Sequence, residues 1–139
     1  MNDSDLSAYA GFTLRVANGI LFLAHGLLKL LVFTPAGTAG FFESLGLPGF
    51  VAYLTIAAEL GGGLALIAGV GTRFVALALL PVLLGAAWLV HAGNGWLFSN
   101  EGGGWEFPVY WAVSLVVLAL LGDGAFSLRS FRARRMAAA

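Results

Sequence analysis

The sequence predicts an all-α integral membrane protein, a bundle of four transmembrane helices with both termini in the cytoplasm. Three observations lead to this fold class. Of the 139 residues, 60% are hydrophobic and only 10% are charged, a composition suited to lipid rather than to water. Apolar stretches of about 20 residues, the length of helix that crosses a bilayer, recur along the chain. The arginines fall on one side of the predicted bundle.

The apolar stretches form one predicted domain, residues 13–121. Its four spans cover about residues 13–33, 50–70, 73–93 and 106–121. Pro35 follows the first span, where a helix is expected to stop. Gly71 and Thr72 alone separate the second and third spans, so these two should form an antiparallel hairpin. The fourth span is the shortest, with Pro108 near its first turn.

The orientation follows from the basic residues other than Arg15 and Lys29, which are Arg73 in the second loop and the tail residues Arg129, Arg132, Arg134 and Arg135. The positive-inside rule places these residues in the cytoplasm. The N-terminal segment, residues 1–12, and the basic tail, residues 122–139, are then both inside. Residues 34–49 and 94–105 contain no Lys or Arg and form the outer loops. The predicted location is the cytoplasmic (inner) membrane, with the lipid bilayer as the main partner and no face for nucleic acid.

Smaller features complete the predicted bundle. Residues 1–13 lack the basic region of a cleaved signal peptide, so the first span is expected to remain. Gly61, Ala65 and Gly69 recur every four residues, a small-residue pattern typical of close helix packing in membranes. Residues 41–45 are expected to form a short interfacial helix. A homo-oligomer is compatible with these features.

Polar side chains inside the spans are costly in lipid and therefore need an explanation. Arg15, Asn18, His25 and Lys29 fall within a sector of roughly 80° on the first span, so they should face the interior of the bundle. Arg15 lies at the inner edge, where we expect it to anchor the interface. Glu59 lies near the centre of the second span and is a plausible partner for Lys29 or His25.

These positions predict one polar pocket in the outer half of the bundle, open to the outer face. Its predicted members are His25, Lys29, Glu59, His91 and Glu106. Three aromatic side chains are expected to flank a bound ring, namely Trp88, Trp105 and Tyr110. Each polar member also has a purely structural interpretation. Lys29 can reach the headgroups or pair with Glu59, a histidine can bond across helices, and Glu106 can cap the fourth span.

Five short strings of the sequence, in order along the chain, resemble the DoxX family. They are Ala24-His25-Gly26-Leu27-Leu28-Lys29, Ala36-Gly37-Thr38-Ala39-Gly40-Phe41-Phe42, Glu59-Leu60-Gly61-Gly62, His91-Ala92-Gly93-Asn94-Gly95 and Gly104-Trp105-Glu106-Phe107-Pro108. The resemblance extends over about residues 14–121. It implies a four-helix membrane protein associated with redox metabolism, because relatives are linked to thiosulfate:quinone oxidoreduction, quinone handling and oxidative-stress complexes. The five predicted pocket residues match the family's polar positions by residue type.

The predicted function is that of a redox-associated membrane subunit whose pocket holds a quinone head group or a small anion such as thiosulfate. Histidine and glutamate can relay protons, and Lys29 can stabilise an oxyanion. The chain contains no cysteine and no flavin or nucleotide signature, so it has no built-in cofactor and any redox activity needs a borrowed one, for which quinone is the candidate. A redox partner subunit would have to deliver or accept the electrons.

Other interpretations stay open at this point. A haem held by His25 and His91 is a minority reading, because the two differ in depth by about 9 Å. A metal held by His25, Glu59, His91 and Glu106 lacks diagnostic spacing, so no metal site is expected. A small transporter using Glu59, or a scaffold without its own chemistry, would explain the same intramembrane charges.

Overall fold

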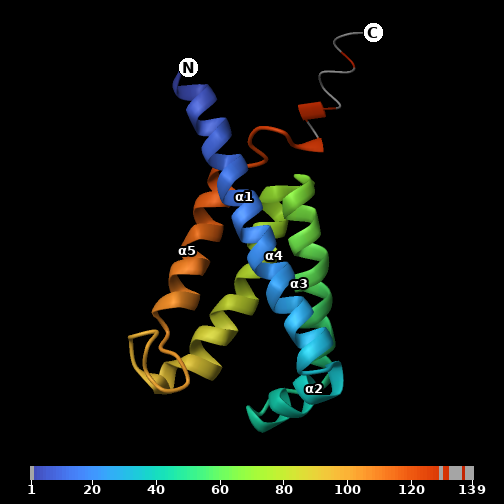
Figure 1. The fold of residues 1–139 in the computed structure, drawn as a ribbon, viewed down its shortest axis with the longest axis vertical. Coiled ribbons are helices and arrows are strands. Elements are labelled where there is room, and N and C mark those ends of the chain that lie inside the picture. The colour runs from blue at the N-terminus through green and yellow to red at the C-terminus, as the bar shows by residue number, and fades with distance from the viewer. Residues whose placement is uncertain (1, 129, 132–135, 137–139) are drawn as a thin grey trace.

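The computed structural model of the chain describes residues 2–128, 130, 131 and 136 (Figure 1). The described residues are helical or irregular, with no strand among them. The predicted basic tail lies partly outside this range, since Arg129, Arg132, Arg134 and Arg135 are not among the described residues.

The first helix is longer than the predicted span. Helix α1 (Asp3–Leu27) continues as η1 (Leu28–Val32), a π-helical turn, so that residues Asp3–Val32 form one apolar helix of 30 residues. Asn2 starts it with a capping box, in which its side chain accepts from the Asp5 N–H and satisfies one of the unpaired donors of the first turn. Most of the segment predicted to precede the first span, residues 1–12, therefore belongs to the same helix.

The short helix of the first loop also starts earlier than predicted. Helix α2 spans Pro35–Ser44 rather than residues 41–45. Thr34 breaks the chain between η1 and α2 with a φ of 64°, and its hydroxyl accepts from the Gly37 N–H. Pro35 fits the first helical position because a proline there loses no hydrogen bond.

The remaining helices follow the predicted order. They are α3 (Phe50–Ala68), α4 (Thr72–Gly85) with its continuations η2 (Ala86–His91, a π-helical turn) and η3 (Ala92–Asn94, a 3₁₀ turn), and α5 (Glu106–Leu121). Three apolar helices are long enough to cross a membrane, namely Asp3–Val32, Phe50–Ala68 and Thr72–Asn94, and α5 is a shorter apolar helix. These are the apolar helices found within the part of the chain that the structure describes.

The helices pack as two pairs that diverge. Helix α1 lies against α3 and α4 lies against α5, and the α3–α4 hairpin joins the pairs. Gly69 and Gly71 make its tight turn with φ values of 69° and 59°, which glycine adopts without a steric penalty. The pairs meet near this turn and separate toward the end that carries α2 (Figure 1). We call the end of the bundle at this turn the closed end, and the end that carries α2 the open end.

Of the small residues predicted to pack, Gly69 is buried and a Cβ there would lie 2.9 Å from Cζ of Arg15, but Gly61 does not bring α1 and α3 together. A Cβ atom on Gly19 would lie 2.8 Å from the Gly63 carbonyl oxygen, and a Cβ on Gly63 would lie 2.9 Å from the Gly19 oxygen. Gly61, by contrast, is exposed and would gain no neighbour within 4 Å. The packing role predicted for Gly61 is wrong because Gly63, two residues further along, lies about 200° around the helix.

Candidate functional site

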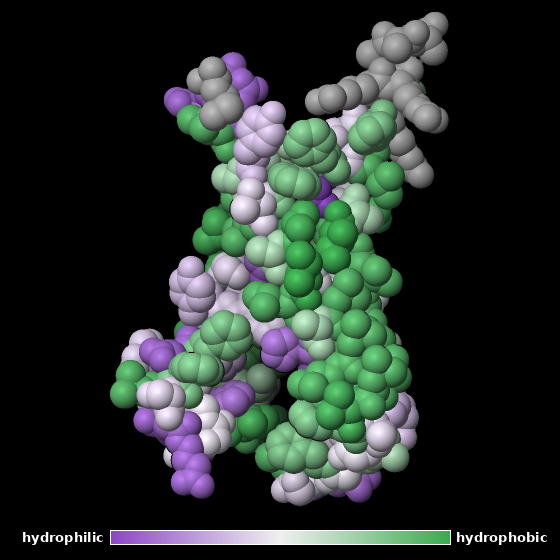
Figure 2. Space-filling model, in the orientation of Figure 1, coloured by the Kyte–Doolittle hydropathy of each residue, from purple (hydrophilic) through white to green (hydrophobic). Residues whose placement is uncertain are grey.

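A cavity of about 970 Å³ opens between the two helix pairs at the open end. One wall comes from the end of α1, η1, α2 and α3, and the other from α4, η2, α5 and the loop before α5. Figure 2 shows the surface hollowed between these two walls. Most of the lining is apolar or aromatic, with a small polar set consisting of His25, Lys29, Thr38, Thr55, Glu59 and His91. Such a lining, with few polar groups, is typical of small-molecule sites.

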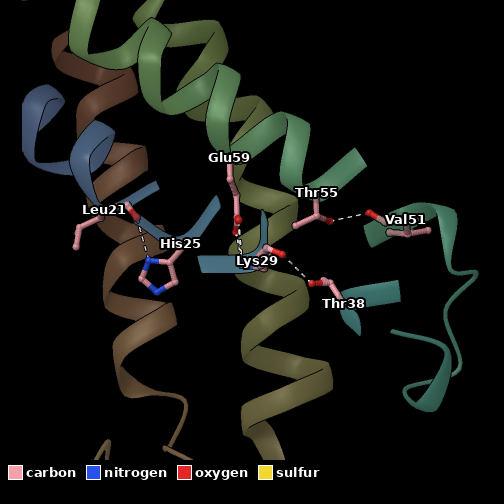
Figure 3. A network of polar contacts seen from close by, with 7 residues as sticks. All are labelled: Leu21, His25, Lys29, Thr38, Val51, Thr55 and Glu59. Atoms are coloured by element: carbon pink, nitrogen blue, oxygen red, sulfur yellow. Dashed lines mark hydrogen bonds and ion pairs between the residues drawn. The ribbon is translucent and has the colours of Figure 1, made fainter. Parts of the chain in front are cut away.

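The strongest polar contact of the cavity is an ion pair between α3 and η1 (Figure 3). The Lys29 ammonium donates to both carboxylate oxygens of Glu59 at 2.9 Å. The Glu59 side chain is 4% exposed, whereas the Lys29 side chain is 18% exposed. The carboxylate is therefore shielded, while part of the lysine side chain faces open space. The predicted partnership of these two residues is confirmed.

The π-helical turn and a glycine place this pair. A Cβ on Gly26 would lie 3.2 Å from Cβ of Glu59, so the missing side chain lets α1 approach α3 at this level. One turn later the wider η1 carries Lys29. Such π-helical turns are frequent at functional sites. The Thr38 hydroxyl donates to the Thr34 carbonyl at 2.9 Å and lies 3.5 Å from the Lys29 carbonyl, which brings α2 against this turn (Figure 3).

His25 stands beside the ion pair on the cavity wall. Its Nδ1 lies 2.9 Å from the Leu21 carbonyl oxygen (Figure 3). Because a carbonyl oxygen only accepts, Nδ1 carries the proton, and in the neutral ring Nε2 keeps its lone pair. The imidazole packs against the Trp111 ring with centroids 4.9 Å apart. His25 thus combines a fixed ring with a nitrogen that can exchange a proton.

His91 also lines the cavity, but its visible contact holds a loop. Its Nδ1 donates to the Gly103 carbonyl at 2.9 Å, and the Asn94 amide donates to the carbonyls of Gly102 and Gly103, both at 3.0 Å. Gly103 itself lines the cavity. These bonds fasten the loop before α5 over one side of the cavity.

Glu106 lies outside the cavity, as do the three aromatic residues predicted to flank a ring. Glu106 accepts from the Phe98 N–H at 2.6 Å and borders a separate, smaller hollow with Tyr110. Trp88 is 79% exposed on the outside of the bundle. Trp105 packs edge-on against Trp96 with centroids 4.5 Å apart. The structure therefore brings together His25, Lys29, Glu59 and His91 and separates Glu106 from them.

The aromatic wall of the cavity comes from residues that the sequence analysis did not select. They are Phe33, Phe41, Phe42, Phe98, Phe107 and Trp111. Trp111 is the most constrained of these, because its Nε1 donates to Asn18 Oδ1 at 2.8 Å. The Ser114 hydroxyl donates to the same oxygen at 3.0 Å. The N–H of a buried tryptophan needs an acceptor. Asn18, on the polar face of α1, can supply that acceptor and was therefore the signal in the sequence that could have identified Trp111 as a cavity residue.

The closed end holds the remaining intramembrane charge. Arg15 is fully buried rather than placed at an interface as predicted. Its guanidinium donates to the carbonyls of Leu66 at 2.6 Å and Ile67 at 2.5 Å, and to those of Ala125 and Phe126 at 3.2 and 3.4 Å. The last carbonyls of a helix lack partners within it, and the buried guanidinium of Arg15 supplies donors to them at the end of α3.

The metal alternative has no support in the geometry. Within the part of the chain that the structure describes, no three His, Cys, Asp or Glu side chains converge as a metal site would require. His25, Glu59, His91 and Glu106 in particular do not form such a group.

Comparisons with known proteins agree with this architecture. The DoxX family model matches residues 10–92. A Bacillus subtilis (strain 168) protein named "Putative oxidoreductase CatD" is 36% identical over 118 residues, which are 85% of this chain and 83% of that protein. An Escherichia coli (strain K12) protein named "Inner membrane protein YqjF" is 34% identical over 116 residues, 82% of this chain and 85% of that protein. No solved structure matches the chain. The resemblance noted in the sequence is confirmed, and the chain belongs to the DoxX family of membrane proteins.

Proposed function

We propose that this membrane protein binds the head group of a membrane quinone in the cavity of the open end, as a subunit of a redox system. The observation that carries the proposal is a largely aromatic and aliphatic cavity of about 970 Å³ with the Lys29–Glu59 pair and His25 at its wall. This volume lies at the upper end of the range of about 300–1,000 Å³ typical of small-molecule sites.

The charge of the site favours a neutral ligand over a small anion. Lys29 and Glu59 together carry no net charge, and two of the three ammonium protons already point to Glu59. The third can donate to a ring carbonyl. Thiosulfate would bring two negative charges beside a buried carboxylate and an apolar wall, which costs free energy. A quinone instead matches the aromatic lining from Phe107 and Trp111.

The residues of the site can also handle the protons that quinone reduction requires. A bound quinone accepts electrons and protons when it is reduced, and the electrons would come from a partner subunit. The Lys29 ammonium would stabilise negative charge on a ring oxygen. His25, held by Leu21, would give or take a proton at Nε2.

The shape of the cavity favours a closed site over a transport path. Its lining residues on α1 begin at His25, those on α3 end at Glu59 and those on α4 begin at Pro81. All of them belong to the open half. The other half contains the buried Arg15 and the packed residues Leu66, Leu115 and Leu118. A permeation route would have to continue through this half.

The proposed topology places the open end on the outer side of the inner membrane. The helices Asp3–Val32, Phe50–Ala68, Thr72–Asn94 and α5 would be the four spans, and local thinning of the bilayer would accommodate the shorter α5. Arg73 at the closed end supports a cytoplasmic location for both termini. The name of the Escherichia coli relative supports the inner membrane.

Fluorescence quenching tests quinone binding directly. A variant with Trp88, Trp96 and Trp105 changed to Phe keeps Trp111, the tryptophan that lines the cavity, as its only one. Titration with decylubiquinone or menadione should quench Trp111 saturably in purified protein. Adding Lys29→Met with Glu59→Leu keeps the charge balance and should weaken binding at least about tenfold, which corresponds to one lost charge-assisted hydrogen bond.

Two controls make the titration decisive. Tyr110→Phe lies outside the cavity and should leave the titration unchanged. Thiosulfate at millimolar concentration should not compete. If Glu59→Gln, His25→Ala and the double variant all bind quinone like the parent, the cavity is not the quinone site. Competition by thiosulfate would instead indicate an anion site.

A further inference from the structure

The smaller hollow beside the cavity has a chemistry of its own. It encloses about 400 Å³ and is lined by Trp96, Phe98, Glu106, Phe107 and Tyr110. Phe98 and Phe107 also line the main cavity, so they separate the two spaces. Four aromatic side chains thus surround one carboxylate. None of the polar residues of the main cavity borders this hollow.

The carboxylate of Glu106 has unused capacity. One of its oxygens accepts from the Phe98 N–H at 2.6 Å, and a carboxylate offers about four acceptor positions. Among the described residues, no Lys or Arg forms an ion pair with it. The Phe98 bond fixes its position, because Phe98 belongs to the loop and Glu106 to the first turn of α5.

The surroundings of the hollow are acidic. The segment from Asn94 to Glu106 contains Glu101 and Glu106 and no Lys or Arg. Residues 34–49, which include α2 at the same end of the molecule, add Glu43 and again no basic residue. Negative charge without compensation raises the local concentration of cations.

We propose that this hollow binds an organic ammonium group, with Glu106 as its counter-ion and the rings of Trp96, Phe107 and Tyr110 around it. Aromatic faces attract cations through their quadrupole, and quaternary ammonium groups are recognised in this way. Aromatic residues that serve only as interfacial anchors need neither a hollow nor a fixed carboxylate among them. The ammonium group can belong to a lipid headgroup such as that of phosphatidylcholine or to a small soluble cation.

Equilibrium dialysis of the purified, detergent-solubilised chain against labelled tetramethylammonium tests the site. The native chain should bind one equivalent. Glu106→Gln keeps an oxygen for the Phe98 N–H but removes the charge, and Tyr110→Leu removes a ring. Each should weaken binding at least about fivefold. Glu101→Gln is the matched control, because it removes a charge from the same loop outside the hollow.

The comparison of variants decides the outcome. Equal binding by the native chain and by Glu106→Gln would overturn the proposal, as would an equal loss in Glu101→Gln, which would mean general attraction to an acidic surface. Quinone titration of the same samples shows whether each variant is folded, since none of these changes touches the ion pair of the main cavity.

A second arm identifies the source of the ammonium group. The chain in nanodiscs of phosphatidylcholine mixed with phosphatidylglycerol should retain phosphatidylcholine during detergent extraction, measured by mass spectrometry, and Glu106→Gln should not. Binding of tetramethylammonium without selective lipid retention would assign the site to a soluble cation. Failure of both arms would refute the site.

Discussion

The two ends of the bundle treat their buried charges in opposite ways. At the closed end, Arg15 donates to four backbone carbonyls, and Asp123 accepts from the Thr72 N–H at 3.1 Å. At the open end, Lys29 and Glu59 contact each other beside a cavity of about 970 Å³. Backbone carbonyls bind the guanidinium at the closed end, whereas the ion pair at the open end lines a cavity.

Together with the proposed function, this difference distinguishes polar residues that hold the fold from polar residues that can contact a ligand. A buried charge needs partners wherever it lies. Where the backbone supplies them, as around Arg15, the charge holds helix ends together. Where the partner is another side chain and the helices diverge, hydrogen-bonding capacity is left for a ligand. Burial by itself does not distinguish the two, because Arg15 and Glu59 are 0% and 3% exposed.

The largest expected effect comes from breaking the closed end. Arg15→Leu leaves the Ile67 carbonyl without its donor in a dry environment, at a cost of about 1–3 kcal/mol, and leaves the Leu66 carbonyl with only the Gly69 N–H at 3.1 Å. We expect a loss of at least about 4 kcal/mol in the free energy of unfolding, measured by denaturant titration in detergent micelles. The Arg73 side chain is exposed, and its guanidinium donates to the Leu120 carbonyl at the long distance of 3.5 Å. Arg73→Leu should therefore change the free energy of unfolding by less than about 1 kcal/mol. Equal stability of both variants would show that Arg15 does not hold this end.

The ion pair should behave differently when one or both partners are removed. Lys29→Met strands the Glu59 carboxylate and should cost about 3 kcal/mol, because one buried charge loses its partner. Lys29→Met with Glu59→Leu should recover most of this stability while quinone binding stays weakened at least about tenfold. The same denaturant titration and the Trp111 quenching assay measure the two properties. Recovery of binding together with stability would assign the pair a purely structural role.

A smaller effect tests the contact that joins α1 to α3. Gly63→Ala places a Cβ 2.9 Å from both the Gly19 carbonyl oxygen and the Leu23 nitrogen. These are backbone atoms that cannot rotate away, so we expect a loss of about 2 kcal/mol in thermal unfolding. Gly61→Ala is the matched control and should be neutral or stabilising by up to about 1 kcal/mol. The reverse order would restore the small-residue pattern predicted from the sequence.

The smallest stability effect concerns the link between the two ends. Asn18→Leu removes the acceptor of Trp111 Nε1, whereas the Ser114 hydroxyl can still donate to the Trp111 carbonyl at 2.8 Å, so the change should cost about 1–2 kcal/mol. In the single-tryptophan background, Trp111 emission should shift and quinone quenching should weaken, because the ring is no longer fixed against His25. Ser114→Ala keeps the Trp111 bond and should change the emission little. Unchanged emission in Asn18→Leu would show that packing alone holds the ring.

Much of the helical organisation could be predicted from sequence because it depends on local chemistry. Apolar length, Pro35 and the glycines around residue 70 set where helices stop and turn. The Lys29–Glu59 pair could also be inferred, since two opposite charges in neighbouring spans have few other partners. The rotation of α3 about its own axis could not be predicted, because small residues occur on several faces of this helix. The face that contacts α1 carries Gly63 rather than Gly61.

The site was harder to predict because its shape depends on how the helices diverge. Depth along a span placed Glu106 near His91, yet the loop before α5 turns Glu106 into a separate hollow. Trp111 was missed because a tryptophan within a span resembles any other apolar residue until its partner, Asn18, is placed across from it. Arg15 was assigned to an interface because nothing in its own helix reveals the carbonyls at the end of α3.

Photoaffinity labelling with an azidoquinone, in membranes and with peptide mapping, tests directly whether the cavity at the open end binds quinone. If quinone binds in the cavity, we expect cross-links to α2 near Phe41 and Phe42 and to α5 near Phe107 and Trp111, all of which line the cavity. Excess unlabelled quinone should abolish these cross-links. Labelling that excess quinone does not suppress, or that concentrates on outward-facing residues such as Trp88 and Leu31, would contradict binding in the cavity.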